Sequence, residues 1–293
     1  MTQENGPGGS VVRRWQLGET LRQLREQAHL THDQVVAALR DGPGKWSRPK
    51  LSRIENRAQG VRPGEVESLL DLYRVTDPEL RRTVVELAGQ SRDRGWVVDI
   101  RASLPQQLHR LLDWEAALVA SRQFETLLVP GLLQTPEYAR ALVTGMHPTL
   151  AQDEVERRVA ARIARQQILS RDVPPRLHVI LDAGVLERPV KSAPVMRTQL
   201  RRLAEATEAT HITIQVLPKS VGASPALEGP FAVLTPPEPM PDIGYTEGTG
   251  GARYIEDRDP VRDLVLRFGV LSEQALRPHE SVRHLVDAAE GYR

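Results

Sequence analysis

The stretch from residue 17 to residue 56 constrains the fold more than any other part of the chain. In its first third, apolar residues recur at three- and four-residue spacing, as they do in a helix with one buried face. Thr31 followed by Gln34 is a capping box, which predicts that a second, short helix begins there. After a loop, a third helix is expected to bury Leu51 and Ile54 and to carry basic side chains on another face. The stretch therefore predicts three short helices that pack together.

Basic residues gather around the third of these helices, although the chain as a whole is almost neutral. It has 39 basic and 38 acidic residues, so any attraction for nucleic acid must be local. The basic residues between positions 40 and 62 are Arg40, Lys45, Arg48, Lys50, Arg53, Arg57 and Arg62. Two short helices, the second of them basic on its outer face, fit the major groove of duplex DNA. Aromatic residues make up only 4% of the chain, too few for the stacking surfaces of single-strand binders, so duplex DNA is favoured.

Two motifs in this stretch resemble a known family. They read Leu-Thr-x-x-Gln-Val-Val-x-x-Leu from Leu30 to Leu39 and Lys-Leu-Ser-Arg-Ile-Glu-Asn from Lys50 to Asn56. Both resemble the helix-turn-helix of the phage-repressor (XRE, Cro/C1-type) family, and the resemblance covers residues 13–75. It implies a helical domain that binds an operator in double-stranded DNA. The loop between the second and third helices is longer here than the tight turn usual in the family.

The expected DNA contacts lie at the start of the third helix and close to it. Pro49 disfavours a helical conformation at the residue before it, so we expect Arg48 as the helix cap and Pro49 at the first position. By position in the family motif, Arg48 and Arg53 would read bases and Lys50 would assist them. The expected DNA-binding residues are Thr31, Lys45, Ser47, Arg48, Lys50, Arg53 and Arg57, of which the first two would touch the sugar-phosphate backbone. The alternative is that these are ordinary solvated residues.

A further expectation concerns the packing of the first helix against the third. Arg25 lies one residue off the apolar stripe of the first helix, and Glu55 follows Ile54 at the edge of the buried face of the third. The family motif has an arginine and a glutamate at these positions. We therefore expect a partly shielded ion pair between Arg25 and Glu55, with two independent surface charges as the alternative.

From residue 104 onward the pattern changes to helices followed by short strands. Helices are expected at 108–121, 136–143, 153–170, 196–207, 260–275 and 279–289, and strands at 176–182, 211–217, 230–234, 242–247 and 252–256. This mixture is typical of an α+β domain. The expected fold class is mainly α with a smaller α+β part, in which a five-helix phage-repressor-like DNA-binding domain precedes a C-terminal α+β domain.

The length of 293 residues suggests two domains. We expect a disordered lead over residues 1–12, the helix-turn-helix DNA-binding domain over 13–83, a helical linker over 84–102 and a regulatory and dimerisation domain over 103–293. A fifth helix is expected to open at Asp77-Pro78 and to run to about Gln90.

The second half also resembles a known type of domain. The segments that carry this resemblance are Phe124–Ala141, Arg162–Leu169, Ile214–Pro218 and Leu227–Phe231. They are similar to the C-terminal domain of unassigned function that follows an XRE module in many actinobacterial regulators, some of them described as antitoxin-like. The resemblance implies a small partner protein encoded nearby. Residues 124–134 are apolar but broken by Pro130-Gly131, so they are a candidate signal-receiving groove, with plain core as the alternative.

The composition and the motifs limit the other kinds of site that the chain can contain. The absence of cysteine excludes disulfides and thiolate sites and fits the cytoplasm, and no apolar run approaches the length of a membrane span. His29 and His32 have no third ligand nearby, so a surface pair is favoured over a metal site. With no nucleophile motif present either, we expect no enzyme activity, no cofactor and no metal.

Two functions therefore stay open. The first is a sequence-specific DNA-binding transcriptional regulator that binds an inverted repeat as a homodimer and senses a signal through its C-terminal domain. The second is an antitoxin-like partner-binding protein whose DNA binding serves autoregulation.

Overall fold

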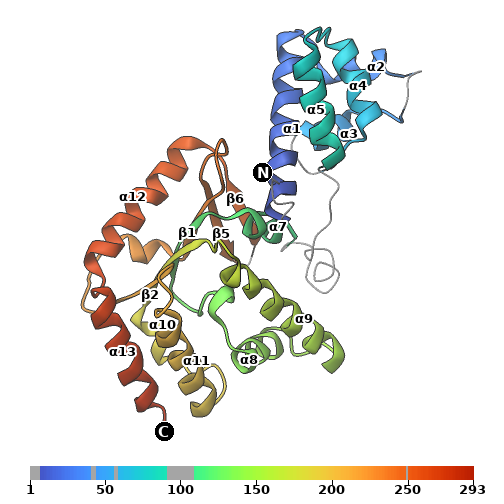
Figure 1. Ribbon diagram of the computed structural model, residues 1–293. Coiled ribbons are helices and arrows are strands. Elements are labelled where there is room, and N and C mark those ends of the chain that lie inside the picture. The colour runs from blue at the N-terminus through green and yellow to red at the C-terminus, as the bar shows by residue number, and fades with distance from the viewer. Residues whose placement is uncertain (1–6, 41–43, 56–58, 91–108, 249) are drawn as a thin grey trace. The chain divides into compact units, whose positions relative to one another are not determined.

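The computed structural model describes residues 7–40, 44–55, 59–90, 109–248 and 250–293 (Figure 1). The chain forms two compact units, Met1–Val97 and Val98–Arg293. Within the described ranges, the first unit is helical and the second contains a six-stranded sheet with helices, so the expected fold class is confirmed. In these ranges no helix is both long enough and apolar enough to cross a membrane.

The described residues of the first unit form five helices around one core. They are α1 (Pro7–Gln27), α2 (His32–Ala38), α3 (Arg48–Glu55), α4 (Pro63–Leu72) and α5 (Pro78–Gln90). Leu21, Val35, Leu51 and Leu69 are fully buried, and they bring α1 to α4 together in one cluster. The apolar spacing seen in the sequence therefore becomes the packed face of each helix.

The helices of the first unit differ from two expected segment boundaries. α1 begins at Pro7, so residues 7–12 of the expected disordered lead are helical, and proline suits the first turn of a helix because its missing N–H has no partner to lose there. Val84 and Ala88 are buried in the core of the first unit. The described part of the expected linker, residues 84–90, therefore belongs to this unit as the second half of α5.

The sheet of the second unit has the strand order β3-β2-β1-β4-β5-β6. Its strands are β1 (Ala120–Glu125), β2 (Arg176–Asp182), β3 (Ile212–Leu217), β4 (Phe231–Thr235), β5 (Ile243–Gly248) and β6 (Gly251–Ile255). β1, β2 and β3 are parallel, whereas β4, β5 and β6 join as antiparallel neighbours. Five strands were predicted, but β1 was not, because its sequence Ala-Ser-Arg-Gln-Phe-Glu has no clean apolar alternation.

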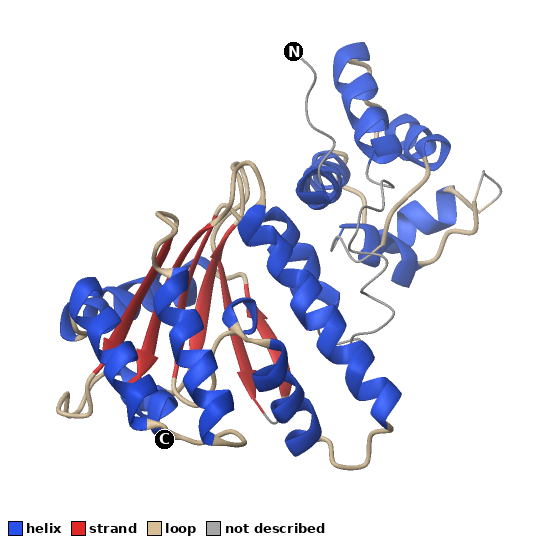
Figure 2. Cartoon of the chain, turned by 60° about the horizontal axis from the view of Figure 1, so that its bottom comes forward, coloured by secondary structure: helices blue, strands red, loops and turns tan. Residues whose placement is uncertain are grey.

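Helices lie on both sides of this sheet (Figure 2). They are α7 (His109–Ala117), α8 (Pro136–Met146), α9 (Gln152–Arg165), α10 (Ala183–Glu187), α11 (Ala193–Ala206), α12 (Arg258–Gln274) and α13 (Pro278–Gly291). α12 packs Leu264, Phe268 and Leu271 against a cluster that includes Phe124 and Ile180 of the sheet. Gly244 of β5 lets α12 approach closely, because a Cβ there would lie 2.6 Å from Leu264.

Candidate nucleic-acid interface

The second helix begins as the sequence predicted. Thr31 is its N-cap, its hydroxyl accepts a hydrogen bond from the backbone N–H of Gln34 at 3.3 Å, and its own backbone N–H donates to the Gln34 side chain at 2.8 Å. The capping box is thus confirmed. Thr31 is exposed, so the cap leaves the start of α2 open to a phosphate group.

The start of α3 differs from the prediction by one residue. Arg48 is the first residue of the helix rather than its cap. Ser47 takes the capping position, since its hydroxyl accepts from the N–H of Lys50 at 3.3 Å and its carbonyl from the N–H of Leu51 at 3.0 Å. A serine is a better cap than an arginine because its short hydroxyl reaches the free N–H groups of the first turn.

The face of α3 that points away from the core is basic. Leu51, Ile54 and Glu55 are buried, while Arg48 and Arg53 are exposed. The Arg48 side chain is 69% exposed, and its nearest described acid, Asp33, lies 3.7 Å away. Arg53 donates its Nε–H to the neutral side chain of Gln59 at 2.9 Å. Both guanidinium groups therefore keep most of their charge available to a ligand.

The other expected contact residues fall into three groups. Lys45 and Ser47 are exposed beside the start of α3. Arg57 lies outside the described residues. Lys50 is placed differently: its ammonium lies 2.6 Å from Glu65 Oε1 and 4.5 Å from the centre of the Trp46 ring, and its side chain is only 14% exposed. The position of Lys50 in the family motif put it with the DNA contacts as a helper, but its ammonium pairs with Glu65 within the first unit.

Glu65 is a supporting residue that sequence reasoning missed. Burial alone would raise the pKa of its carboxyl, yet hydrogen bonds from Lys50 and from the backbone N–H of Arg62 hold that pKa below its usual value. Gly44 has φ +94°, and a Cβ there would collide with the Glu65 carboxylate. Glu65 of α4 therefore binds Lys50 of α3 and lies close to Gly44, which precedes α3. From the sequence, a glutamate at the third position of α4 predicts only a helix cap.

The expected ion pair between Arg25 and Glu55 is present. Arg25 donates Nε–H and Nη2–H to the two oxygens of Glu55 at 2.7 and 2.9 Å, and the two side chains are 12% and 4% exposed. His32, which we expected at the surface, also lies 2.9 Å from Glu55 through Nε2. Arg25 further donates to the carbonyl of Leu30 at 2.9 Å. Glu55 thus links α3 to both α1 and α2.

Most of the candidate signal-receiving groove at residues 124–134 is core, although Leu127 is 54% exposed. Phe124, Val129 and Leu133 are at most 1% exposed. The break at Pro130-Gly131 becomes a short 3-10 helix, Gly131–Leu133, whose carbonyls accept from two glutamine side chains: the buried Gln199 donates to Leu133, and the half-buried Gln166 to Gly131. β1 ends earlier, at Glu125, and the proline and glycine turn the chain after it.

Comparison with protein families agrees with the two-unit fold. A model described as a helix-turn-helix domain matches residues 16–84, and one described as a domain of unknown function (DUF5753) matches residues 108–287. Neither the curated proteins nor the solved structures gave a match to this chain. The helix-turn-helix match indicates DNA binding and regulation of transcription.

Proposed function

The chain belongs to the family defined by the domain of unknown function DUF5753, here preceded by a helix-turn-helix domain, and from this premise we propose that it is a sequence-specific transcriptional regulator of the phage-repressor (XRE, Cro/C1) type. The observation that carries the proposal is the exposed, basic face of α3, where Arg48 and Arg53 lie opposite the buried Leu51 and Ile54. Arginine is the side chain that most often reads guanine, through paired hydrogen bonds in the major groove.

We propose that Thr31, Lys45 and Ser47 hold the sugar-phosphate backbone beside this helix. All three are exposed, and two of them lie at helix starts, where free N–H groups attract phosphate. Lys50 is not included, because it is bound to Glu65. We propose the cytoplasm as the location of the protein, because a regulator of this type acts on DNA there.

We also propose that the protein binds as a homodimer to an inverted repeat. One module of this size contacts few base pairs, and two modules related by a two-fold axis are needed for useful specificity. The second unit offers an apolar surface for association, because Leu266 and Val270, one turn apart on α12, are 60% and 41% exposed.

The same surface supports the second candidate function, in which the chain binds a small partner protein and DNA binding serves autoregulation. The two candidates differ in what covers Leu266 and Val270. The mass of the purified chain distinguishes them: a stable homodimer supports the first, and a monomer that gains one small protein from its own cells supports the second.

The test of DNA recognition is a selection from a pool of random DNA duplexes. The full chain is expected to enrich one motif made of two inverted half-sites whose centres lie about 34 Å, or one helical turn, apart. Duplexes recovered without any shared motif would overturn sequence-specific recognition. A single motif without its inverted copy would keep recognition but remove the dimer.

A further inference from the structure

One face of the central sheet changes from polar to apolar along its parallel strands. Near the carboxyl ends of the parallel strands, Phe124 and Ile180 pair in register and lie in the core beneath α12. Two residues earlier on the same face, Arg122, His178 and Thr213 form a row across β1, β2 and β3. On the opposite face β2 and β3 present buried apolar residues, whereas β1 places Ser121, Gln123 and Glu125 there. The polar row lies at the end of its face where the parallel strands begin.

A hollow of about 490 Å³ lies over this polar row. Its lining residues include Ser121, Arg122, Arg176, His178, Thr210, His211, Thr213, Thr235 and Asp242. They come from five adjacent strands or the residues next to them, so the sheet itself holds them at fixed spacing. The volume is in the range of small-molecule sites, which span roughly 300–1,000 Å³.

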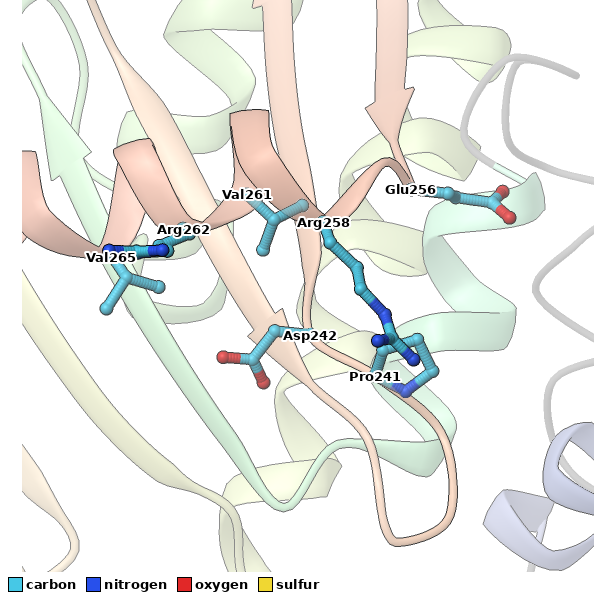
Figure 3. Close-up of a pocket in the computed structure, with 7 residues that line it drawn as sticks. All are labelled: Pro241, Asp242, Glu256, Arg258, Val261, Arg262 and Val265. Atoms are coloured by element: carbon cyan, nitrogen blue, oxygen red, sulfur yellow. The ribbon is translucent and has the colours of Figure 1, made fainter.

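The charges around the hollow favour an anion. Asp242 is the one carboxylate among its lining residues, and Arg122 already neutralises it at 2.7 Å. Arg176 is exposed and adds a positive charge without an acid beside it among the lining residues. Asp242 also lines a second hollow of about 420 Å³, where Arg258 and Arg262 extend from the first turns of α12 (Figure 3). The two linings together carry Arg122, Arg176, Arg258 and Arg262 against Asp242 and Glu256, so their net charge is positive.

The neutral groups of the hollow are arranged to donate and accept hydrogen bonds. His178 is fixed through Nε2, which lies 2.7 Å from the Gln215 side-chain oxygen, and Gln215 is held in turn by Ser272 at 2.8 Å. Burial lowers the pKa of His178, and the nearby charge of Arg122 adds to this, so the ring is neutral at pH 7. His211 Nε2 is buried without a hydrogen-bond partner among the described residues. Buried polar atoms normally have a partner, and an oxygen of a bound molecule would supply one.

We propose that this hollow is a binding site for a small organic anion that carries carboxylate or phosphate groups. Arg176 and Arg122 bind the anionic group, and the threonine hydroxyls of the neighbouring strands and His178 orient the rest of the molecule. The idea that this anion is the signal of a DNA-binding regulator rests on the proposed function. The binding of the anion in this hollow does not rest on it.

The binding test uses isothermal titration calorimetry on the full chain at constant ionic strength, with citrate as the carboxylate probe and pyrophosphate as the phosphate probe. One of the two is expected to bind with one site per chain. Arg176→Gln is expected to weaken that binding about tenfold, the loss of one charge-assisted hydrogen bond. The matched control is Arg201→Gln, which removes an exposed arginine on α11 away from the hollow and is expected to change nothing.

A second variant is expected to have the opposite effect on the affinity for the anion. Asp242→Asn frees Arg122 from its ion pair and removes the only carboxylate of the lining, so it is expected to tighten anion binding. The proposal is overturned if neither probe binds at millimolar concentration, if the control weakens binding as much as Arg176→Gln does, or if Asp242→Asn weakens binding. Because no DNA is present, each of these results leaves the proposed DNA recognition intact, and a failure of DNA recognition leaves the anion site intact.

Discussion

Glu55 is a buried acid that holds three helices of the first unit together. Its two oxygens bind Arg25 of α1 and His32 of α2, although only 4% of its side chain is exposed. Burial alone would raise the pKa of the carboxyl, but the hydrogen bonds from Arg25 and His32 outweigh burial and hold the pKa below its usual value. The ionised form is therefore bound more tightly in the folded chain than in the unfolded chain.

Replacing Glu55 with alanine is expected to destabilise the first unit by about 3 kcal/mol at pH 7, because it leaves Arg25 shielded from water without its acid. The folded-state pKa lies below the unfolded one, so this contribution is present above the unfolded pKa of about 4.3 and is lost as the pH falls through the folded-state value. Hydrogen exchange of the first-unit amides in the full chain measures the difference.

The matched control is Glu67→Ala, since Glu67 is an exposed acid on α4. It is expected to change stability by less than about 0.5 kcal/mol at any pH. A cycle with Arg25→Ala completes the measurement. A coupling energy of zero between positions 25 and 55 would mean that the Arg25–Glu55 pair does not help to hold α3.

Among the helices of the first unit, the contacts that hold α3 in place are as important for the proposed DNA binding as its exposed basic face. Glu65 reaches from α4 to Lys50 on α3 and to the backbone of Arg62, and Gly44 lies against its carboxylate. α3 is thus joined to α4 through the Lys50–Glu65 pair, in addition to its links to α1 and α2 through Glu55.

Lys50→Ala tests this supporting role. It leaves Glu65 without its ammonium partner, so we expect a lower free energy of unfolding and weaker binding to all DNA sequences, with the selected motif unchanged. The measurement is the selection from random duplexes repeated with the variant. A changed base preference at one position would instead show that Lys50 reads DNA.

Much of the fold could be predicted from local patterns, and the exceptions have physical causes. The helices α2 and α3 and the strand β3 follow from capping and from apolar spacing that a single element carries. β1 was missed because its polar residues interrupt the apolar pattern: Arg122 finds its partner in Asp242, far along the chain, and Gln123 bonds Glu125 of the same strand. The same limit applies to the candidate site: Lys50 and Arg53 look alike in sequence, and only Glu65, fifteen residues away from Lys50, separates their roles.

In the proposed function, two copies of the whole chain bind one operator. We expect sedimentation to show a homodimer both free and bound to the selected duplex, because specificity for a two-fold repeat needs both modules. A duplex with only one half-site is the control, and it is expected to bind much more weakly at the same salt concentration. A monomer in both states would remove the dimer from the proposal.

The most direct measurement of the central claim is the affinity of Arg53→Ala for the selected duplex and for a scrambled one. We predict a loss of about 1–3 kcal/mol on the selected duplex and a much smaller loss on the scrambled one, because a base contact is lost. The control Arg82→Ala removes an exposed arginine of α5 that pairs with Glu79, and it should leave the preference between the two duplexes unchanged. If Arg53→Ala keeps the full preference for the selected duplex, the outer face of α3 does not read DNA as proposed.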